Sequence, residues 1–444
     1  MRSDTPRVLL VNPWIHDFAA YDVWARPLGL LRLGAILRAH GYAVAFVDCL
    51  DRFHPSLPPT DPTARFGRGP YPKTPIPRPP GLEDVPRTYS RYGIDPAVIR
   101  RNLSAQPRPD LILVTSMMTY WYPGVAETVA HLRDAFPGTP VILGGIYARL
   151  LTDHAAARIG ADRVVTSAAE GEIVELAGRL TGAGGQSRLD PEDPDAWPYP
   201  ALDLCRRIPF VPLQTVRGCP FRCAYCASGL LDPVSRRRSP EAVAAEIAYW
   251  HDAHGVIDFV FYDDALLVAP ERHAIPLFEA VIRSGRRVRF HTPNAVHIRE
   301  MDDRMAALMR RAGVETLRLG LETTDADRRG LDQKATFPGF RRAAAALRRA
   351  GFSGKSVGAY LLWGLPGQTE GDLVPEIDAV KAEGITPILA QYTPIPGTAL
   401  WRTACEASRY PLEADPVFTN NAVFPCQPSF SWETLSRLKA RIAG

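Results

Sequence analysis

The sequence has no apolar run near the ~20 residues that a membrane-spanning helix requires, which excludes an integral membrane protein. The first apolar stretch, Val8–Val11, meets Pro13 almost at once. That stretch is too short for the core of a signal peptide, so we expect a cytoplasmic protein. Only seven cysteines occur in 444 residues, too few for a disulfide scaffold. Clustered cysteines in such a protein more often bind metal or act in redox chemistry.

Lysine is equally scarce, because five lysines stand among the 52 basic residues and the formal net charge is only +4. The densest basic run, Arg236-Arg237-Arg238, could contact a phosphate or a carboxylate, although a solvated loop is the simpler interpretation. No long basic stripe with interleaved aromatic residues is present. Nucleic acid is therefore not an expected partner.

A length of 444 residues predicts two or three domains. Short apolar runs alternate with helical patterns through the first 182 residues, which predicts one α/β domain with a doubly wound, Rossmann-like parallel sheet. The expected strands are Val8–Val11, Ala43–Asp48, Asp110–Thr115, Val141–Leu143 and Arg163–Thr166. The expected helices include Pro27–Ala39, Val125–Phe136 and Glu172–Leu180.

A proline-rich insert, residues 55–92, interrupts this alternation. Eleven prolines stand between residues 55 and 86, and proline has no backbone N–H to donate to a sheet. We expect an extended excursion, either a disordered insert or a strap across a site. A Gly-, Asp- and Pro-rich linker is predicted over residues 183–212.

The second half repeats the strand–helix alternation six times over residues 213–400. The expected strands are Leu213–Val216, Asp258–Tyr262, Arg287–His291, Thr316–Gly320, Val357–Leu362 and Pro387–Tyr392. The expected helices are Pro240–Ala253, Glu271–Ser284, Asp302–Ala312, Phe337–Ala350 and Glu370–Glu383. Six such units predict a partial (β/α)6 barrel with functional residues at the carboxyl ends of the strands. Residues 401–444 are predicted to be a carboxy-terminal extension.

The strongest motif is Cys219-x3-Cys223-x2-Cys226, in which Gly218 and Pro220 favour a loop after a strand. Helical spacing would allow a buried apolar stripe instead. A structural zinc site requires a fourth ligand, and no Cys or His stands at a usual zinc spacing. An iron–sulfur cube held by three cysteines leaves one iron open, as a catalytic centre requires.

This motif, with Tyr225 before the last cysteine and six strand–helix units around it, resembles the radical S-adenosylmethionine (SAM) superfamily. The resemblance implies a [4Fe-4S] cluster on Cys219, Cys223 and Cys226 that cleaves SAM to a 5′-deoxyadenosyl radical. It implies a flavodoxin- or ferredoxin-type electron donor and a small-molecule substrate.

The other strand ends carry groups that the resemblance assigns to SAM. Asp263 and Asp264 would bind the amino group, and Glu322 the ribose hydroxyls. Backbone at Gly364 would approach the adenosine. Asn294 or its neighbour His291, with Gln391, would contact the cofactor or the substrate. The further expected SAM contacts are therefore Tyr225, Asp263, Asp264, Asn294, Glu322, Gly364 and Gln391.

The amino-terminal domain resembles the cobalamin-binding domain of cobalamin-dependent radical SAM enzymes. Ser116 ends one predicted strand and Gly144-Gly145 end the next, where that family lines a channel for the nucleotide tail of cobalamin. His16 is a candidate lower cobalt ligand, although the stretch lacks the Asp and Gly of the ligating motif. An ordinary Rossmann-like domain is the alternative, but no G-x-G-x-x-G follows Val11.

These resemblances predict a cobalamin-dependent methyltransferase that acts on an unactivated carbon. Two alternatives stay open. The first is a radical enzyme that catalyses a rearrangement, cyclisation or oxidation without methyl transfer. The second is a sensor that binds cobalamin or an iron–sulfur cluster without catalysis.

Overall fold

The computed structural model describes residues 5–183, 187, 189–325, 331, 335–427 and 431–444. By its internal contacts the chain divides into two compact units, Met1–Pro209 and Phe210–Gly444, and we describe each by itself. Within the described ranges, no helix combines the length and apolar composition needed to cross a membrane.

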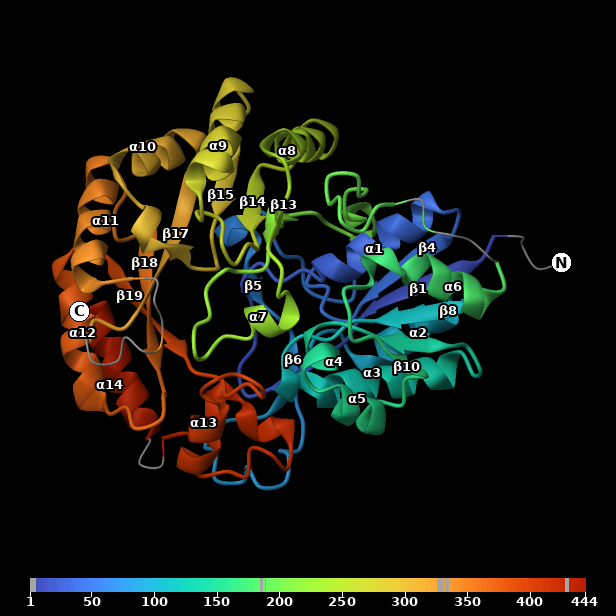
Figure 1. Ribbon diagram of the computed structural model, residues 1–444. Helices are drawn as coiled ribbons and strands as arrows, with labels where there is room; N and C mark the ends of the chain where they lie inside the picture. Colours follow the sequence, from blue (N-terminus) through green and yellow to red (C-terminus); the bar gives the residue numbers. More distant parts are fainter. Residues whose placement is uncertain (1–4, 184–186, 188, 326–330, 332–334, 428–430) are drawn as a thin grey trace. The chain divides into compact units, whose positions relative to one another are not determined.

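Unit 1 is built on a five-stranded parallel sheet in the order β10-β9-β8-β1-β4 (Figure 1). Its strands are β1 (Arg7–Asn12), β4 (Ala43–Asp48), β8 (Leu111–Val114), β9 (Val141–Leu143) and β10 (Arg163–Val164). Its helices are α1 (Leu28–Ala39), α2 (Pro96–Ser104), α3 (Tyr122–Ala135), α4 (Ile146–Leu150), α5 (Thr152–Arg158) and α6 (Ile173–Thr181). The order is that of a doubly wound sheet whose winding reverses between β1 and β8.

Alternating side chains explain why helices cover both faces of this sheet. Val8 and Leu10 of β1 pack in one cluster with α1 and α6. Leu9 and Val11 point the other way, into a cluster with α2, α3 and α5. Both faces are apolar, as a buried parallel strand requires. The predicted α/β fold with a doubly wound parallel sheet is therefore confirmed.

The proline-rich insert is more regular than its composition predicts. It contains β5 (Gly69–Pro70), β6 (Lys73–Pro75) and β7 (Ser90–Tyr92); β5 pairs with β3 (Tyr21–Asp22), and β7 pairs with β2 (Ile15–Asp17) and β6. The expectation that this segment cannot donate to a sheet was wrong. Residues between the prolines still donate, as Ile76 N does to Tyr89 O at 3.0 Å, and the prolines keep their carbonyls. Within the three-stranded sheet, β6 lies at the edge, where proline is tolerated.

Unit 2 is built on a curved parallel sheet in the order β11-β14-β15-β17-β18-β19, with β16 beside β17 (Figure 1). Its strands are β11 (Val211–Leu213), β14 (Asp258–Phe261), β15 (Arg289–His291), β16 (Val296–His297), β17 (Val314–Glu322), β18 (Val357–Trp363) and β19 (Thr386–Gln391). The first and last strands, β11 and β19, form the edges of this described sheet. It is an open, partial barrel.

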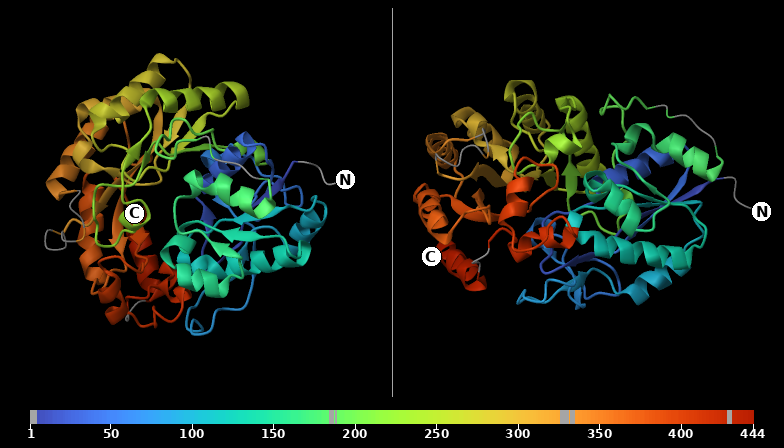
Figure 2. Two further views of the ribbon diagram at one scale, coloured as in Figure 1. Left: turned by 45° about the vertical axis from the view of Figure 1, so that its right-hand side comes forward. Right: turned by 60° about the horizontal axis from the view of Figure 1, so that its bottom comes forward.

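Helices follow the strands along the outside of this sheet, as an arc running from yellow-green to red (Figure 2). They are α8 (Pro240–His254), α9 (Ala274–Arg283), α10 (Asp303–Ala312), α11 (Phe337–Arg349) and α12 (Glu370–Ala382). Ser239 caps α8, its hydroxyl accepting from Ala242 N. The last helix, α14 (Trp432–Ala443), is tied to α12 by the ion pairs Arg437–Glu370 and Arg441–Asp378.

One predicted strand is divided. Leu213–Val216 was expected to be continuous, but the chain leaves the main sheet after β11. It then forms β12 (Val216–Arg217), which pairs with β13 (Arg236–Arg237) as a two-stranded ribbon. This break lifts the following cysteine loop out of the sheet.

Gly93 provides a test of how tightly the insert is attached. It has φ of +120°, and a Cβ there would lie 2.2 Å from Cys49 O. Gly160 is a matched control, because its φ is +73° and a Cβ would meet nothing within 4 Å. We expect Gly160→Ala to cost about 1 kcal/mol through backbone strain alone and Gly93→Ala to cost several times more. The midpoint of thermal unfolding measures both variants, and equal losses would contradict the close contact.

Candidate functional site

The cysteine motif occupies an irregular loop directly after β12. Gly218 begins the loop with φ of +78°, and a Cβ there would lie 2.8 Å from Asp232 O, so only glycine fits without strain. The Arg217 guanidinium is bound to the Asp232 carboxylate at 2.8 Å. Farther along, Ala224 fixes the loop twice: its N donates to Leu331 O at 2.9 Å and its O accepts from Leu400 N at 3.0 Å.

The three cysteines lie on this pinned loop. Cys223 is buried, whereas Cys219 and Cys226 are partly exposed. Cys226 N donates to Cys223 O at 3.0 Å, which closes a turn around Tyr225. The Cys226 sulfur accepts from Ser228 N at 3.4 Å.

The thiolates do not form a single-ion site. Within the described residues, no three His, Cys, Asp or Glu side chains are close enough together to hold one metal ion. A cube places each thiolate on a different iron, so its ligands need not converge on one ion.

Asp263 holds the base of the cysteine loop. Its Oδ1 accepts hydrogen bonds from Thr215 N at 2.9 Å, from Thr215 Oγ1 at 2.7 Å and from Val216 N. Thr215 Oγ1 also lies 2.7 Å from His273 Nε2. The same carboxylate therefore ties the end of β14 to the residues that lead into the loop.

The other oxygen of Asp263 has no hydrogen-bond partner, although the side chain is buried. Burial raises the pKa of Asp263 to about 7, against the lowering effect of the hydrogen bonds from Thr215 and Val216. A buried carboxylate oxygen without a donor is costly, so Oδ2 is a ready acceptor for a cationic ligand. Asp264, by contrast, is exposed.

Asn294 and His291, the two candidates at the end of β15, have different environments. Asn294 is exposed and its Nδ2 donates to Tyr262 O at 2.9 Å, which links the ends of β14 and β15. His291 is fully buried, with Nε2 2.9 Å from Asp258 Oδ1 and Nδ1 2.8 Å from Thr316 Oγ1. His291 therefore serves the packing of the sheet and is not a candidate for cofactor contact.

Glu322 ends β17 in an unusual backbone conformation. Its φ is +65°, the strand register shifts between Gly320 and Glu322, and the side chain is 7% exposed. Left-handed backbone at a buried, non-glycine residue is strained and is characteristic of ligand sites. Burial raises the pKa of the nearby Tyr360, an effect that the charge of Glu322 reinforces and that of Arg318 opposes.

The loop after β18 is held by a residue that the sequence motif did not single out. Gln368 Oε1 accepts from Gly364 N at 3.0 Å and from Leu365 N at 3.2 Å, and its Nε2 donates to Leu362 O at 2.9 Å. Gly364 has φ of +91°. Gln391 ends β19 opposite Trp363 of β18. The signal for Gln368 was present in the run Gly364-Leu-Pro-Gly-Gln, but only its backbone contacts reveal the role.

Parallel pairing brings these residues to one edge of unit 2. Because β11, β14, β15, β17, β18 and β19 pair in parallel, their carboxyl ends lie along the same edge. That edge presents a thiolate loop, an unpartnered buried carboxylate oxygen and a strained glutamate. The set can hold a metal–sulfur cluster beside a ligand that carries an ammonium group and hydroxyls.

In unit 1, Ser116 follows β8 and lies against the two glycines that follow β9. Ser116 Oγ donates to Gly144 O at 2.7 Å and accepts from Ala148 N at 3.2 Å. A Cβ at Gly145 would lie 2.2 Å from Ser116 O, so this glycine allows the loops to meet. A Cβ at Gly144 would meet nothing within 4 Å, so open space lies beside it.

His16 lies on β2, in the small sheet that the insert forms, and is 8% exposed. Its Nε2 lies 2.7 Å from Glu127 Oε2, and Arg91 of β7 binds the other oxygen of Glu127 at 2.7 Å. The pKa of Glu127 is lowered despite burial, because His16, Arg91 and His131 surround it. His16 could bind a metal through Nε2 only by releasing Glu127.

Comparison with known proteins shows which families and structures this chain is similar to. Residues 213–380 match the radical SAM superfamily. An uncharacterized methyltransferase of Pyrococcus horikoshii is 25% identical over 328 residues, which are 67% of this chain and 69% of that protein. The anaerobic magnesium-protoporphyrin IX monomethyl ester cyclase of Synechocystis is 25% identical over 246 residues, 49% of each chain.

Both units share the fold of a solved structure. The radical SAM methyltransferase TsrM from Kitasatospora setae, determined with cobalamin and a [4Fe-4S] cluster bound, superposes with a TM-score of 0.68. The match covers 99% of this chain and 91% of that chain at 17% identity. At this identity the likeness establishes the fold.

The raised pKa of Asp263 predicts how the stability of the folded protein depends on pH. The pKa of Asp263 in the folded, ligand-free protein is about 7, above the ordinary 3.8. The stability that its protonation contributes is present below pH 4 and is lost as the pH rises through 7. We expect wild-type stability to fall relative to Asp263→Asn between pH 4.5 and 7.5, measured by urea unfolding of iron-free protein. Exposed Asp264→Asn is the control, and a constant difference between wild type and Asp263→Asn would contradict the assignment.

Proposed function

Residues 213–380 belong to the radical SAM superfamily, and on this premise we propose that the protein is a cobalamin-dependent radical methyltransferase that acts on a carbon of a small molecule. The observation that carries the proposal is the cysteine loop at the carboxyl edge of a partial barrel, in a chain that also has a doubly wound unit. The similarity to a methyltransferase over 67% of the chain supports the reaction type.

We assign Cys219, Cys223 and Cys226 to a [4Fe-4S] cluster and the neighbouring strand ends to SAM. When bound, the cluster supplies the electron that cleaves SAM to methionine and a 5′-deoxyadenosyl radical, and the corrinoid supplies the methyl group. The pinned loop holds the thiolates in place, and Tyr225 lies in the turn between two of them. Reduction requires an external donor of flavodoxin or ferredoxin type.

The proposed contacts to SAM use hydrogen-bonding groups at the ends of the strands. Asp263 Oδ2 is buried and accepts nothing, so it suits the ammonium, with exposed Asp264 beside it in sequence. Glu322 is positioned to accept hydrogen bonds from ribose hydroxyls. Backbone at Gly364, held by Gln368, suits the adenosine, since no side chain intervenes. Asn294 and Gln391 remain for SAM or the substrate.

Unit 1 supplies the corrinoid site in this proposal. The open space beside Gly144 gives the nucleotide tail of cobalamin room between the β8 and β9 loops, and Ser116 fixes those loops. His16 is engaged with Glu127, so lower ligation of cobalt requires a rearrangement there.

A second function is favoured by one observation. The similarity to a cyclase over 49% of the chain supports a radical enzyme that cyclises, rearranges or oxidises its substrate without methyl transfer. A non-catalytic sensor is the remaining alternative. It would bind the same cofactors without turnover, and it gives no reason for a strained Glu322.

Anaerobic reconstitution tests the radical chemistry. With reduced cluster, the protein should convert SAM to 5′-deoxyadenosine, and formation of S-adenosylhomocysteine would distinguish methyl transfer from the other radical reactions. Cys223→Ala should lose the visible absorbance of the cluster and reduce 5′-deoxyadenosine to background. Cys405→Ala, which alters a cysteine outside the loop, should keep both. Intact SAM in the presence of a verified reduced cluster would overturn the proposal.

Gly144 separates cobalamin binding from folding. Gly144→Leu should fill the open space and weaken hydroxocobalamin binding at least about tenfold, since ~1.4 kcal/mol of steric cost suffices. Gly29→Leu is the matched control, because a Cβ at that exposed helical glycine also meets nothing within 4 Å. The absorption spectrum reports the bound corrinoid, and the thermal midpoint reports folding. Undiminished binding in Gly144→Leu would remove these loops from the corrinoid site.

A further inference from the structure

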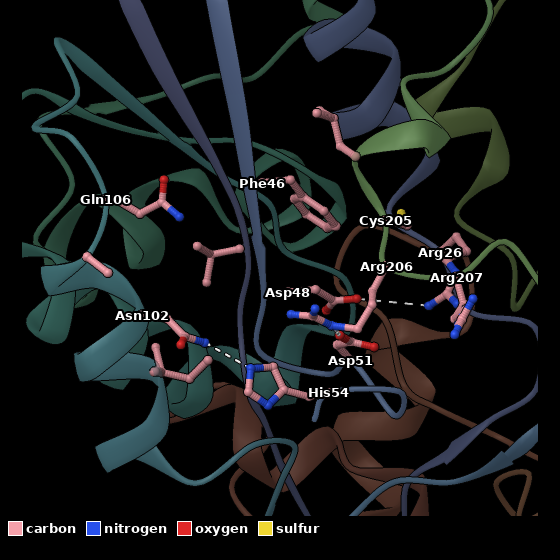
Figure 3. A pocket seen from close by; sticks show the side chains of 14 residues that line it. Arg26, Phe46, Asp48, Asp51, His54, Asn102, Gln106, Cys205, Arg206 and Arg207 are labelled. Atoms are coloured by element: carbon pink, nitrogen blue, oxygen red, sulfur yellow. Dashed lines mark hydrogen bonds and ion pairs between the residues drawn. The ribbon is translucent and has the colours of Figure 1, made fainter. Parts of the chain in front are cut away.

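Unit 1 contains a cavity of about 320 Å³ that the proposed chemistry does not use (Figure 3). It lies at the carboxyl end of β4, between that strand, α2 and residues 204–207. In the sheet, β1 separates β4 from β8, which leads to Ser116. The winding of the sheet reverses between β1 and β8, and the cavity lies on the β1–β4 side of that point, away from Ser116.

Asp48 lines this cavity, and its two carboxylate oxygens have different partners. Its Oδ1 accepts from Asn12 Nδ2 at 2.8 Å and from Leu50 N at 2.9 Å. Its Oδ2 has only the Arg26 guanidinium near it, at 3.9 Å, which is beyond hydrogen-bond distance. The Asp48 side chain is 10% exposed and lines the cavity. A carboxylate oxygen that is ion-paired but has no direct hydrogen bond can accept donors from a ligand.

The position of Asp48 indicates what kind of donor. It ends the second strand of the β1–α1–β4 unit, where doubly wound domains place the carboxylate that accepts hydrogen bonds from ribose hydroxyls. No glycine-rich loop follows β1, so the pyrophosphate of a dinucleotide has no cradle here. The geometry favours a mononucleotide.

The rest of the cavity supplies the other two requirements of a mononucleotide. Phe46, on the face of β4 that packs toward α1, provides an apolar surface that suits a base. Arg206 and Arg207 line the rim, with Arg206 bound to Asp51 at 3.1 Å and Arg207 without a hydrogen bond or ion pair to any residue in the described ranges. Guanidinium groups bind phosphate in a bidentate manner. The volume falls at the lower end of the range for small-molecule sites.

We propose that this cavity binds a nucleoside 5′-phosphate, with the ribose hydroxyls on Asp48 Oδ2, the base against Phe46, and the phosphate on Arg207 and Arg206. The site is independent of the radical chemistry and of the corrinoid.

Calorimetric titration of iron-free, full-length protein with AMP, GMP, CMP and UMP in turn tests the site. At least one should bind, and its 2′-deoxy analogue should bind at least about tenfold more weakly, because a hydrogen bond to a charged group is lost. Asp48→Asn keeps the acceptor for Asn12 and removes the charge, so it should weaken binding to a similar extent. Arg207→Ala should weaken it at least about fivefold. Because Arg207 is exposed, that variant does not put folding at risk.

Two control variants test whether the nucleotide binds in this cavity. Arg100→Ala, an exposed arginine on α2 outside the cavity, should bind as wild type does. Glu322→Gln should also bind as wild type, since it alters only the nucleoside site proposed in unit 2. The proposal is overturned if no nucleotide binds at 5 mM or if the 2′-deoxy analogue binds equally well. Loss in Glu322→Gln instead of Asp48→Asn, or stoichiometric displacement by hydroxocobalamin, would overturn it as well.

Discussion

Parallel strand pairing is the constraint on which the functional residues depend. In both large sheets each hydrogen-bonded strand pair is parallel, so the strands of a sheet end along one edge. Residues separated by more than 100 positions, such as Asp263 and Gly364, reach that edge because the alternation of strands and helices repeats. The chemistry resides in the loop after each strand, and the sheet decides which of these loops are neighbours.

Asp263 shows how one side chain can serve the scaffold and the ligand together. Its Oδ1 fixes the backbone at Thr215 and Val216, where the chain leaves the sheet toward the cysteines. Its Oδ2 stays unsatisfied in the ligand-free protein. Because the hydrogen bonds are already formed, the loop is organised before a ligand arrives, which reduces the entropic cost of binding. The raised pKa of Asp263 reflects this compromise between burial and charge.

In unit 1, loops at the carboxyl edge of one sheet form two separate regions. On one side of β1, Ser116 and the paired glycines bring two loops into backbone contact and leave space beside Gly144. On the other side, Asp48 and the arginines surround a polar cavity. A doubly wound sheet divides its helices between its two faces at the point of reversal, so both flanks of that point can open to a ligand. The insert adds a small sheet that engages His16 and Glu127.

Local patterns in the sequence predicted the strand–helix alternation, the radical SAM motif at Cys219, Cys223 and Cys226, and the places of Ser116, Gly144 and Gly145 at the ends of strands. Each of these is local: a hydrophobic period, a spacing, or a residue type directly after a strand. Only the tertiary structure decided that His291 is a packing residue, that Gln368 holds the Gly364 loop and that the proline-rich insert forms strands. The tertiary structure also shows that Oδ1 of Asp263 is hydrogen-bonded whereas Oδ2 is not, and that Asp48 lines a cavity. Those outcomes depend on which distant backbone groups come within hydrogen-bond distance, and neither spacing nor composition encodes that.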